Sequence, residues 1–301
     1  MTKNDRPAVS VVGAGIMGSA IATRLLASGH QVTVFDLDPA KVAAMVVKGG
    51  KAAPSAAEAA KASRFVITSL NSAAIVRAAI FGPGGIAEAA DAEGLLIDMS
   101  SIDPASTRLL AEELVSKTGM RWVDAPLSGG APGALAGKLT VMAGGMVEDF
   151  LRARAVMDSL CANYTHMGPS GAGQTTKLVN QILCAVSFQA VAEAVRLAEA
   201  GGVDATRLAA ALKGGRADSN ILQEFGPKMA RRDYSPTGRI DNMMKDLEAV
   251  QAFSGAQRLP LPLTGLVTEL HRAFLAAGLG SADTAAMMKQ FVGFREQPTQ
   301  T

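Results

Sequence analysis

Residues 8 to about 166 repeat one pattern, in which a short β-branched run precedes an alanine- and leucine-rich amphipathic segment. Such repeats predict strands alternating with helices around a mostly parallel sheet, because a helix supplies the long crossover that parallel strands need. The expected strands are Ala8–Val12, Gln31–Phe35, Phe65–Leu70, Leu95–Met99, Trp122–Asp124 and Leu139–Ala143. The expected helices between them are Ile16–Ser28, Pro39–Lys48, Pro104–Lys117 and Glu148–Leu160.

A glycine-rich turn at residues 168–173 ends this pattern, and helical periodicity follows it. After Gly173, neither proline nor glycine interrupts the segment to Ala200, which predicts one helix of roughly 40 Å at 1.5 Å per residue. Further helices are expected at Asp204–Lys213, Ile221–Arg232, Asp241–Ser254, Leu263–Ala277 and Ala282–Phe294. We therefore predict an α/β domain over residues 1–168 and an all-helical domain over residues 169–301, entered by a long interdomain helix.

The composition excludes several classes of function. The 301 residues carry 29 basic and 27 acidic side chains, so the net charge of +2 lacks the concentrated positive field that binding to nucleic acid or anionic lipid requires. A 49% hydrophobic content argues against disorder, and no run of about 18 uncharged apolar residues is present to span a bilayer. Neither a nucleic acid nor a membrane is expected as a partner.

The cysteines and histidines offer no metal or redox motif. Cys161 and Cys184 do not form a Cys-x-x-Cys pair, and the three histidines lie far apart in the sequence. We therefore expect no bound metal. The first residues show neither a signal-peptide core nor a transit pattern, so a cytoplasmic location is expected. The Gly-x-Ser-x-Gly turn of serine hydrolases is also absent.

The turn after the first strand carries a dinucleotide fingerprint, Gly13-Ala14-Gly15-Ile16-Met17-Gly18. Its glycines let a pyrophosphate approach bare backbone at a helix N-terminus, as in a Rossmann-type, doubly wound parallel sheet. Asp36 ends the next strand, where a carboxylate can accept hydrogen bonds from the adenosine ribose and repel a 2′-phosphate. The expected cofactor is therefore NAD(H). The alternative is that the glycines only form a tight turn and Asp36 only caps a helix.

A second glycine-rich loop, Asp124–Gly130, follows a later strand. Ser128 and the backbone amides of Gly129 and Gly130 can converge on a small anion such as a carboxylate. On its own this segment is equally consistent with an ordinary Gly/Pro loop.

The long helix carries a polar pair near its start. Lys177 and Asn180 are three residues apart and so project from one helix face. The positive end of the helix dipole and desolvation in a closing cleft would both favour the neutral amine, so Lys177 is a candidate general acid or base. The alternative is a solvated lysine beside an asparagine.

These segments together resemble the β-hydroxyacid dehydrogenase family. The resemblance rests on Gly13–Gly18, Asp124–Gly130, the Gly-x-Gly-x-x-x-Lys-x-x-Asn run from Gly171 to Asn180, and Lys245-Asp246-Leu247, and it spans nearly the whole chain. It implies an active site in the cleft between a Rossmann domain and an all-α domain, and a homodimer or homotetramer.

The resemblance also implies roles for individual residues. Lys177 would protonate the substrate carbonyl as hydride arrives, Asn180 would orient the substrate, and Ser128, Gly129 and Gly130 would hold its carboxylate. The cofactor would further contact Leu70, Asn71, Ser101 and Lys245. The sequence departs from the family pattern at three positions: Asn71 replaces a common proline, Ser101 a threonine and Leu127 a valine.

The expected reaction interconverts a small 3-hydroxy acid and its semialdehyde. Threonate-acting relatives tend to carry histidine at the position of Asn180, so this residue favours a 2-hydroxy-3-oxopropionate (tartronate semialdehyde) reductase. Threonate or 3-hydroxyisobutyrate dehydrogenase is the alternative within the family. A catalytically silent dinucleotide-binding scaffold is the alternative of another class, and the presence of Lys177 argues against it. An imine reductase would usually carry another residue at the lysine position.

Overall fold

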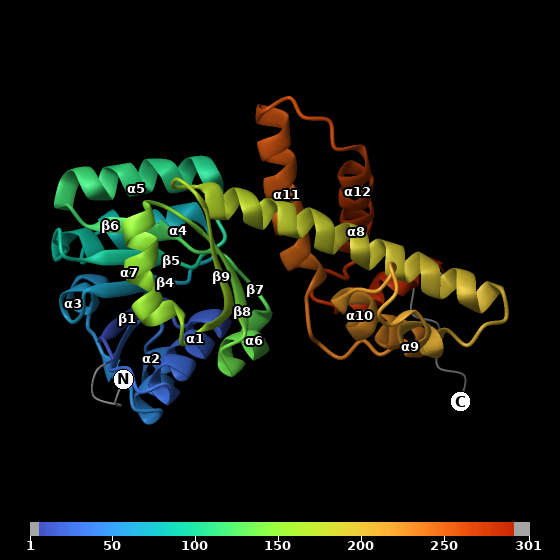
Figure 1. Ribbon diagram of the computed structural model, residues 1–301, viewed down its shortest axis with the longest axis horizontal. Coiled ribbons are helices and arrows are strands. Elements are labelled where there is room, and N and C mark those ends of the chain that lie inside the picture. The colour runs from blue at the N-terminus through green and yellow to red at the C-terminus, as the bar shows by residue number, and fades with distance from the viewer. Residues whose placement is uncertain (1–5, 292–301) are drawn as a thin grey trace. The chain divides into compact units, whose positions relative to one another are not determined.

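The computed structural model describes residues 6–291. The chain divides between Lys177 and Leu178 into two compact units, and the first contains the sheet drawn in blue to green in Figure 1. The predicted domain boundary at 168/169 lies nine residues earlier, because the first compact unit also holds the start of the long helix α8 (Ala172–Ala200). The predicted boundary stays a prediction.

One sheet forms the first unit. Its strands are β1 (Val9–Val12), β2 (Val32–Phe35), β3 (Lys51–Ala52), β4 (Phe65–Thr68), β5 (Leu95–Asp98), β6 (Arg121–Asp124), β7 (Leu127–Ser128), β8 (Leu139–Gly144) and β9 (Cys161–Gly168). The spatial order is β3-β2-β1-β4-β5-β6-β8-β7, with β9 beside β8. The pairs from β3 through β6 are parallel, while β6 and β7 pair antiparallel with β8. The strand order reverses at β1 and β4, as in a doubly wound sheet, so the predicted fold class is confirmed.

Register brings the ends of the parallel strands to one edge. Val12 pairs with Thr68, Thr68 with Asp98, and Asp98 with Asp124. In open α/β sheets, ligands bind outside the carboxyl ends of the strands at the point where the order reverses. The loops that follow these four residues are therefore where a site is expected.

Helices cover both faces of the sheet. They are α1 (Ile16–Ala27), α2 (Pro39–Val47), α3 (Ala56–Lys61), α4 (Ala73–Phe81), α5 (Pro104–Thr118), α6 (Gly130–Ala136) and α7 (Val147–Met157), with a 3₁₀ turn at Ile86–Glu88. Neighbouring strand residues belong to different core clusters: Val11 packs with Ile21 and Leu25, whereas Val12 packs with Ile80 and Leu114. Burial of both faces explains why these strands read as continuous apolar runs.

The second unit is helical in the part of the chain that the structure describes. It contains most of α8, then α9 (Leu208–Leu212), α10 (Asn220–Arg231), α11 (Ile240–Ala256) and α12 (Pro262–Ala276), with 3₁₀ segments at Ala205–Arg207 and Thr284–Phe291. Its core includes Phe188, Val195, Phe225 and Phe274.

Helix α8 is long and apolar enough to cross a membrane by length and composition alone, with a mean hydropathy of 1.5 over 18 residues. The core helices of globular proteins share these properties. Because Phe188, Ala192 and Val195 of α8 are buried in the core of the second unit, we interpret it as a core helix.

Several elements differ from those expected. The sequence pattern did not predict β3, β7, β9, α3, α4 or α6. The segment expected as one helix over Asp204–Lys213 splits into a 3₁₀ turn and α9, and Ala282–Phe294 is a 3₁₀ helix over Thr284–Phe291, with residues 292–294 lying outside the described part. The missed strands are two-residue pairings or, in β9, a polar run with alternating exposure, so none carries the apolar signal of a buried strand.

Candidate active site

The glycine loop Gly13–Gly18 connects β1 to α1 and leaves open space at the helix N-terminus. Gly13 has a φ of 98°, and a Cβ there would lie 2.6 Å from the Ser69 carbonyl oxygen. A Cβ on Gly18 would lie 1.8 Å from the Gly13 carbonyl oxygen, whereas a Cβ on Gly15 would meet nothing within 4 Å. Gly13 and Gly18 are thus required by the turn and by close packing, while Gly15 faces free volume beside the N-terminal amides of α1.

Asp36 points its carboxylate at this loop. Its Oδ2 accepts a hydrogen bond from Ala14 N at 2.7 Å, and its Oδ1 accepts one from Asp38 N at 2.9 Å. The Lys41 ammonium lies 3.7 Å from Asp36 Oδ1 and 3.7 Å from Asp38 Oδ2. Asp36 and the glycine loop, both predicted to bind the cofactor, are therefore in direct contact. The sequence did not predict Lys41, whose one signal is a basic residue in the first turn of the following helix.

A cavity of about 770 Å³ borders Asp36. Gly13, Leu37, Leu70, Ile75 and Pro83 line it, so its wall is mostly apolar, with the charged side chains of Asp36, Asp38 and Lys41 also in the lining. Such a lining suits a flat aromatic base attached to a sugar. Ile75 and Pro83 were not singled out from the sequence, because apolar residues after a strand carry no distinctive motif.

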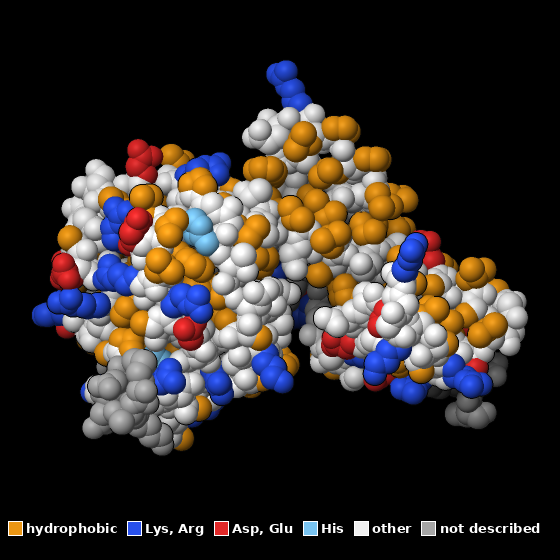
Figure 2. All heavy atoms as spheres, in the orientation of Figure 1, with side chains coloured by type: hydrophobic (Ala, Val, Ile, Leu, Met, Phe, Trp, Pro, Cys, Tyr) orange, Lys and Arg blue, Asp and Glu red, His pale blue; other side chains and the backbone are white. Residues whose placement is uncertain are grey.

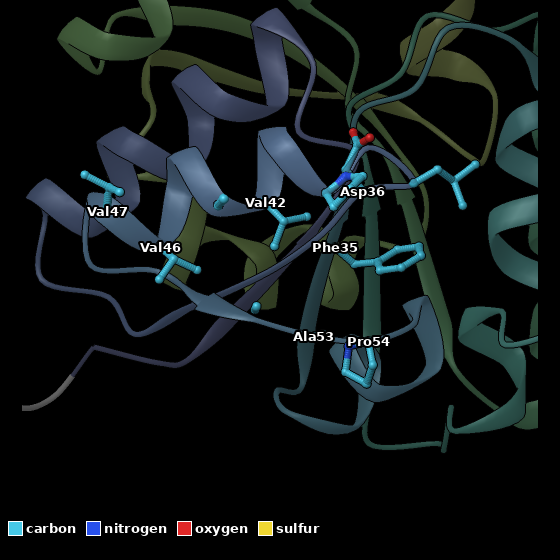
Figure 3. Close-up of a pocket in the computed structure, with 11 residues that line it drawn as sticks. Phe35, Asp36, Val42, Val46, Val47, Ala53 and Pro54 are labelled. Carbon is cyan, nitrogen blue, oxygen red and sulfur yellow. The ribbon is translucent and has the colours of Figure 1, made fainter.

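A second groove, of about 880 Å³, shares Phe35, Asp36 and Pro54 with this cavity. Figure 3 shows Val42, Val46 and Val47 of α2 on one side of the groove and Ala53 and Pro54 on the other. The groove therefore lies beside the sheet edge at β2 and β3.

The loops after β4 and β5 are joined to each other. Leu70 N donates a hydrogen bond to Ser100 Oγ at 3.0 Å. Leu70 also borders the glycine loop, since a Cβ on Gly13 would lie 2.7 Å from its Cδ2 atom. Asn71 is exposed and Ser101 is half-buried. The structure thus places Leu70, Asn71 and Ser101 at the same sheet edge as the glycine loop.

Two carboxylates are buried at this edge, at the ends of β5 and β6. Asp98 Oδ1 accepts hydrogen bonds from Thr68 Oγ1 at 2.8 Å and Ser100 N at 3.1 Å, while its Oδ2 has no partner among the described residues. Burial raises the pKa of Asp98 to about 6, although these hydrogen bonds oppose the shift. Burial also raises the pKa of Asp124, against hydrogen bonds from backbone amides that favour its charged form.

Lys177 reaches the second glycine-rich loop. Its Nζ donates a hydrogen bond to the Leu127 carbonyl oxygen at 2.8 Å. Leu127 directly precedes Ser128 in β7, and Gly129 and Gly130 follow with φ values of 117° and 60°. The structure therefore brings together Lys177 and the loop predicted to hold a carboxylate.

Asn180 and Lys245 belong to the second unit and are connected there through two other polar side chains. Asn180 Nδ2 donates to Gln181 Oε1 at 2.7 Å, and Gln181 Nε2 donates to Asp246 Oδ2. The Lys245 ammonium lies 3.8 Å from Asp246 Oδ1. Gln181 and Asp246 were not predicted as site residues, although Asp246 lies in the Lys-Asp-Leu motif.

No group of three or more potential metal ligands occurs within residues 6–291. The chemistry available at the edge of the sheet is that of an amine, buried carboxylates, hydroxyls and backbone amides. This set can bind a dinucleotide and a small acid, and the amine can exchange a proton with a substrate.

Comparison with known proteins identifies the family. A model of the NAD-binding domain of 6-phosphogluconate dehydrogenase matches residues 8–168, and one described as NAD-binding of NADP-dependent 3-hydroxyisobutyrate dehydrogenase matches residues 171–291. The chain is 34% identical to 2-hydroxy-3-oxopropionate reductase of Escherichia coli, over 92% of this chain and 94% of that protein. It is 34% identical to 3-hydroxyisobutyrate dehydrogenase of Pseudomonas aeruginosa, over 87% and 90%.

A solved structure agrees. The 3-hydroxyisobutyrate dehydrogenase of Mycobacterium tuberculosis with L-serine superposes with a TM-score of 0.87 and 29% identity, over 96% of this chain and 100% of that one. The two family models together cover nearly all of the described residues. The chain belongs to the β-hydroxyacid dehydrogenase family of NAD-binding oxidoreductases, as its motifs predicted.

Proposed function

We propose that this protein is an NAD-dependent oxidoreductase that interconverts a small 3-hydroxy acid and its semialdehyde, with Lys177 as the general acid and base. The observation that carries the proposal is the 2.8 Å hydrogen bond from the Lys177 amine to the Leu127 carbonyl. It sets a proton donor beside the only loop, among those at this edge of the described sheet, that offers a hydroxyl next to two consecutive glycines.

Binding of the cofactor uses the residues around the glycine loop. Asp36 accepts hydrogen bonds from the adenosine ribose, exchanging its bond from Ala14 N for them. Gly15 leaves room for the pyrophosphate at the N-terminus of α1. Leu70, Asn71 and Ser101 would make further contacts with the cofactor, whose nicotinamide would supply or accept a hydride.

Lys177 carries the proton. In the direction of reduction, its Nζ–H is transferred to the carbonyl oxygen while the carbonyl carbon gains the hydride, so an aldehyde becomes a primary alcohol. In oxidation the neutral amine removes the hydroxyl proton. Positioned acid–base catalysis of this kind contributes about 10² to 10⁴ in rate.

The remaining predicted residues hold the substrate and the cofactor. Ser128 Oγ and the amides of Gly129 and Gly130 bind the carboxylate, and Asn180 orients the substrate one helical turn after Lys177. Lys245 contributes a positive charge to the cofactor. Two observations favour tartronate semialdehyde as the substrate. One is the 34% identity to a 2-hydroxy-3-oxopropionate reductase, and the other is the presence of Asn180.

We also propose a cytoplasmic homo-oligomer. Leu259, Leu263 and Leu266, in and just before α12, are exposed, and Figure 2 shows hydrophobic side chains gathered over the face that carries α11 and α12. An apolar face of this kind is typical of an interface between subunits. Light scattering of the purified protein would give the mass of a dimer or tetramer, and a monomer would contradict this part of the proposal.

A substrate panel tests the function. Purified protein is assayed by NADH absorbance in both directions with tartronate semialdehyde and glycerate, threonate, 3-hydroxyisobutyrate and sulfonate analogues. Turnover of one or more of these compounds by the wild type supports the proposal. In Lys177→Ala we expect kcat to fall by about 10²- to 10⁴-fold while the affinity for NADH is retained. Turnover of threonate or 3-hydroxyisobutyrate instead of tartronate semialdehyde would correct the substrate. NADH binding without any turnover would indicate a silent scaffold.

A further inference from the structure

Gln174, on the first turn of α8, is a buried polar residue that the proposed mechanism does not use. Its side chain is 1% exposed. Its Nε2 donates a hydrogen bond to the Ser100 carbonyl oxygen at 2.8 Å, and its Oε1 accepts one from Ile102 N at 3.3 Å. Both ends of the amide are therefore paired with backbone, which a buried side chain needs but which few residue types could satisfy here.

These two hydrogen bonds lie on either side of Ser101. The Gln174 amide thus clamps the loop after β5 on both flanks of a residue predicted to contact the cofactor. We call Gln174 and its bonds to Ser100 and Ile102 the Gln174 clamp. The same loop is fixed to the next strand end, since Ser100 Oγ accepts a hydrogen bond from Leu70 N.

Asp124 also fixes the start of α8. Its Oδ1 accepts a hydrogen bond from Gly171 N at 2.8 Å, and its Oδ2 accepts one from Gln174 N at 3.0 Å. A Cβ on Gly173 would lie 2.4 Å from the Met142 carbonyl oxygen, so the helix also packs against backbone without a gap. The first turn of α8 therefore has little freedom to slide or rotate.

Lys177 follows Gln174 by three residues, less than one helical turn. Because an α-helix is stiff over this length, the clamp ties the backbone of Lys177 to the Ser101 loop, and the hydrogen bond to the Leu127 carbonyl holds the amine at the end of that side chain. Proton and hydride transfer to one carbonyl group need both to be held at the correct separation, and a misplacement of 1 Å can cost about 10² in rate.

We propose that Gln174 is a positioning residue, which sets the distance between the lysine that moves the proton and the Ser101 loop that is expected to contact the cofactor. This inference rests on the proposed function. Because Gln174 is 1% exposed and both ends of its amide are paired with backbone, we expect its loss to slow the chemical step while leaving the binding of substrate and cofactor largely unchanged.

The test is Gln174→Met, which keeps the length and approximate volume of the side chain and removes both hydrogen bonds. The matched control is Gln189→Met on the same helix. Gln189 is also buried, at 7% exposed, and exchanges hydrogen bonds with Gln290 at 3.2 Å and donates one to Glu193 at 2.7 Å. Both variants lose a buried amide from α8, but Gln189 lies three turns beyond Lys177.

The decisive measurement is the single-turnover rate constant of NADH oxidation, obtained by stopped flow and normalised to the bound NADH. This rate constant does not depend on the fraction of folded protein. We expect Gln174→Met to lower this rate and kcat by about 10- to 100-fold, with the NADH Kd and substrate KM changed less than about threefold. Gln189→Met should lower the melting temperature and keep the wild-type rate.

Equal rates in Gln174→Met and the wild type, with only a lower melting temperature, would overturn the inference and leave Gln174 with a structural role. If Gln174→Met does not fold, Gln174→Glu replaces it, because the carboxylate keeps the acceptor for Ile102 N and loses the donor to Ser100 O. A single-turnover rate below that of the wild type in this variant supports the inference, and an unchanged rate overturns it. Lys177→Ala is assayed in parallel: if it retains turnover, the proposed function itself has failed.

Discussion

The Lys177 amine donates a hydrogen bond to the Leu127 carbonyl oxygen at 2.8 Å, across 50 residues of sequence. A carbonyl oxygen accepts a hydrogen bond from an ammonium and, more weakly, from a neutral amine, so the contact can persist after the loss of a proton. Under the proposed mechanism, the lysine can therefore give its proton to the substrate and remain in place to be reprotonated. The acceptor is backbone, so Leu127 serves as well as the valine that is usual at this position.

Lys177→Arg separates proton transfer from hydrogen bonding. The guanidinium keeps the positive charge and donors for the Leu127 carbonyl, but its pKa lies so far above neutral that it does not exchange a proton near pH 7. We expect turnover to fall by about 10² to 10⁴, as in Lys177→Ala, with NADH affinity within about threefold of the wild type. Lys61→Arg on α3, where the lysine is 71% exposed, is the control. Turnover within tenfold of the wild type in Lys177→Arg would contradict a role in proton transfer.

Asp36→Ala tests the choice of cofactor. The substitution removes the acceptor for the ribose and the charge that repels a 2′-phosphate, and it leaves the Lys41 ammonium, now 3.7 Å from Asp36 Oδ1, available to a phosphate. We expect kcat/KM for NADH to fall at least tenfold and the ratio of NADPH to NADH use to rise. Both are measured by steady-state kinetics. The control is Asp38→Ala, which removes the N-cap of α2 and should keep the preference for NADH over NADPH. Better use of NADPH than NADH by the unmodified protein would refute the NAD preference.

The pattern of the sequence predicted the fold where strands are buried on both faces. The runs at β1, β2, β4, β5, β6 and β8 are apolar because helices cover both sides of the sheet. Such runs can be recognised in a single sequence. Strand β9 was missed because its residues alternate between exposed and half-buried. Helix α3 did carry a signal, since Ser55 and Glu58 form the Ser-x-x-Glu start of a helix, and Ser55 Oγ accepts a hydrogen bond from Glu58 N.

The sequence singled out the site residues whose side chains lie in recognisable motifs. It did not identify the backbone groups that form hydrogen bonds with them. The fingerprint singled out Asp36 as a ligand of the adenosine ribose, and in the structure its Oδ2 lies at the glycine loop, where it accepts a hydrogen bond from Ala14 N; its role toward the ribose stays a prediction. No motif marks the Leu127 carbonyl as the partner of Lys177, or Ser100 O and Ile102 N as the partners of Gln174, since every residue type offers these groups. Only the fold, which brings together segments 50 to 74 residues apart, identifies them.

Asp98 should make stability depend on pH. Because its pKa is raised from 3.8 to about 6, the folded state holds a proton between these values that the unfolded state has released. The free energy of unfolding therefore falls as pH rises through this range, and the cost of the buried charge persists above it. Asp98→Asn keeps an acceptor for Thr68 Oγ1 and Ser100 N and removes the charge.

We expect the stability of Asp98→Asn relative to the wild type to increase by about 1 to 3 kcal/mol between pH 4 and pH 7. Urea denaturation at both pH values measures this difference. Asp124, whose pKa is also raised, is present in both proteins, so its contribution cancels to the extent that the two carboxylates act independently. Asp91→Asn, at an exposed site, is the control. A difference that stays constant with pH would contradict the assignment.

Gly15 and Gly18 should respond differently to the same added methyl group. A Cβ on Gly18 would lie 1.8 Å from the Gly13 carbonyl oxygen, so the backbone must move. We expect Gly18→Ala to lose stability by about 1 to 3 kcal/mol or more and to bind NADH poorly for that reason. A Cβ on Gly15 meets nothing within 4 Å, and its φ of −64° suits alanine. Gly15→Ala should therefore keep the wild-type melting temperature within a few degrees.

The methyl group of Gly15→Ala would nevertheless occupy the volume that the pyrophosphate needs, so we expect NADH affinity to fall at least tenfold, measured by titration of NADH fluorescence. Gly265→Ala in α12, where a Cβ also meets nothing within 4 Å, is the control and should change neither quantity. Wild-type affinity in Gly15→Ala would mean that the dinucleotide does not approach this backbone. If Gly15→Ala loses affinity for NADH and keeps its stability, Gly15 is needed for binding of the dinucleotide, whereas Gly18 is needed for packing of the chain.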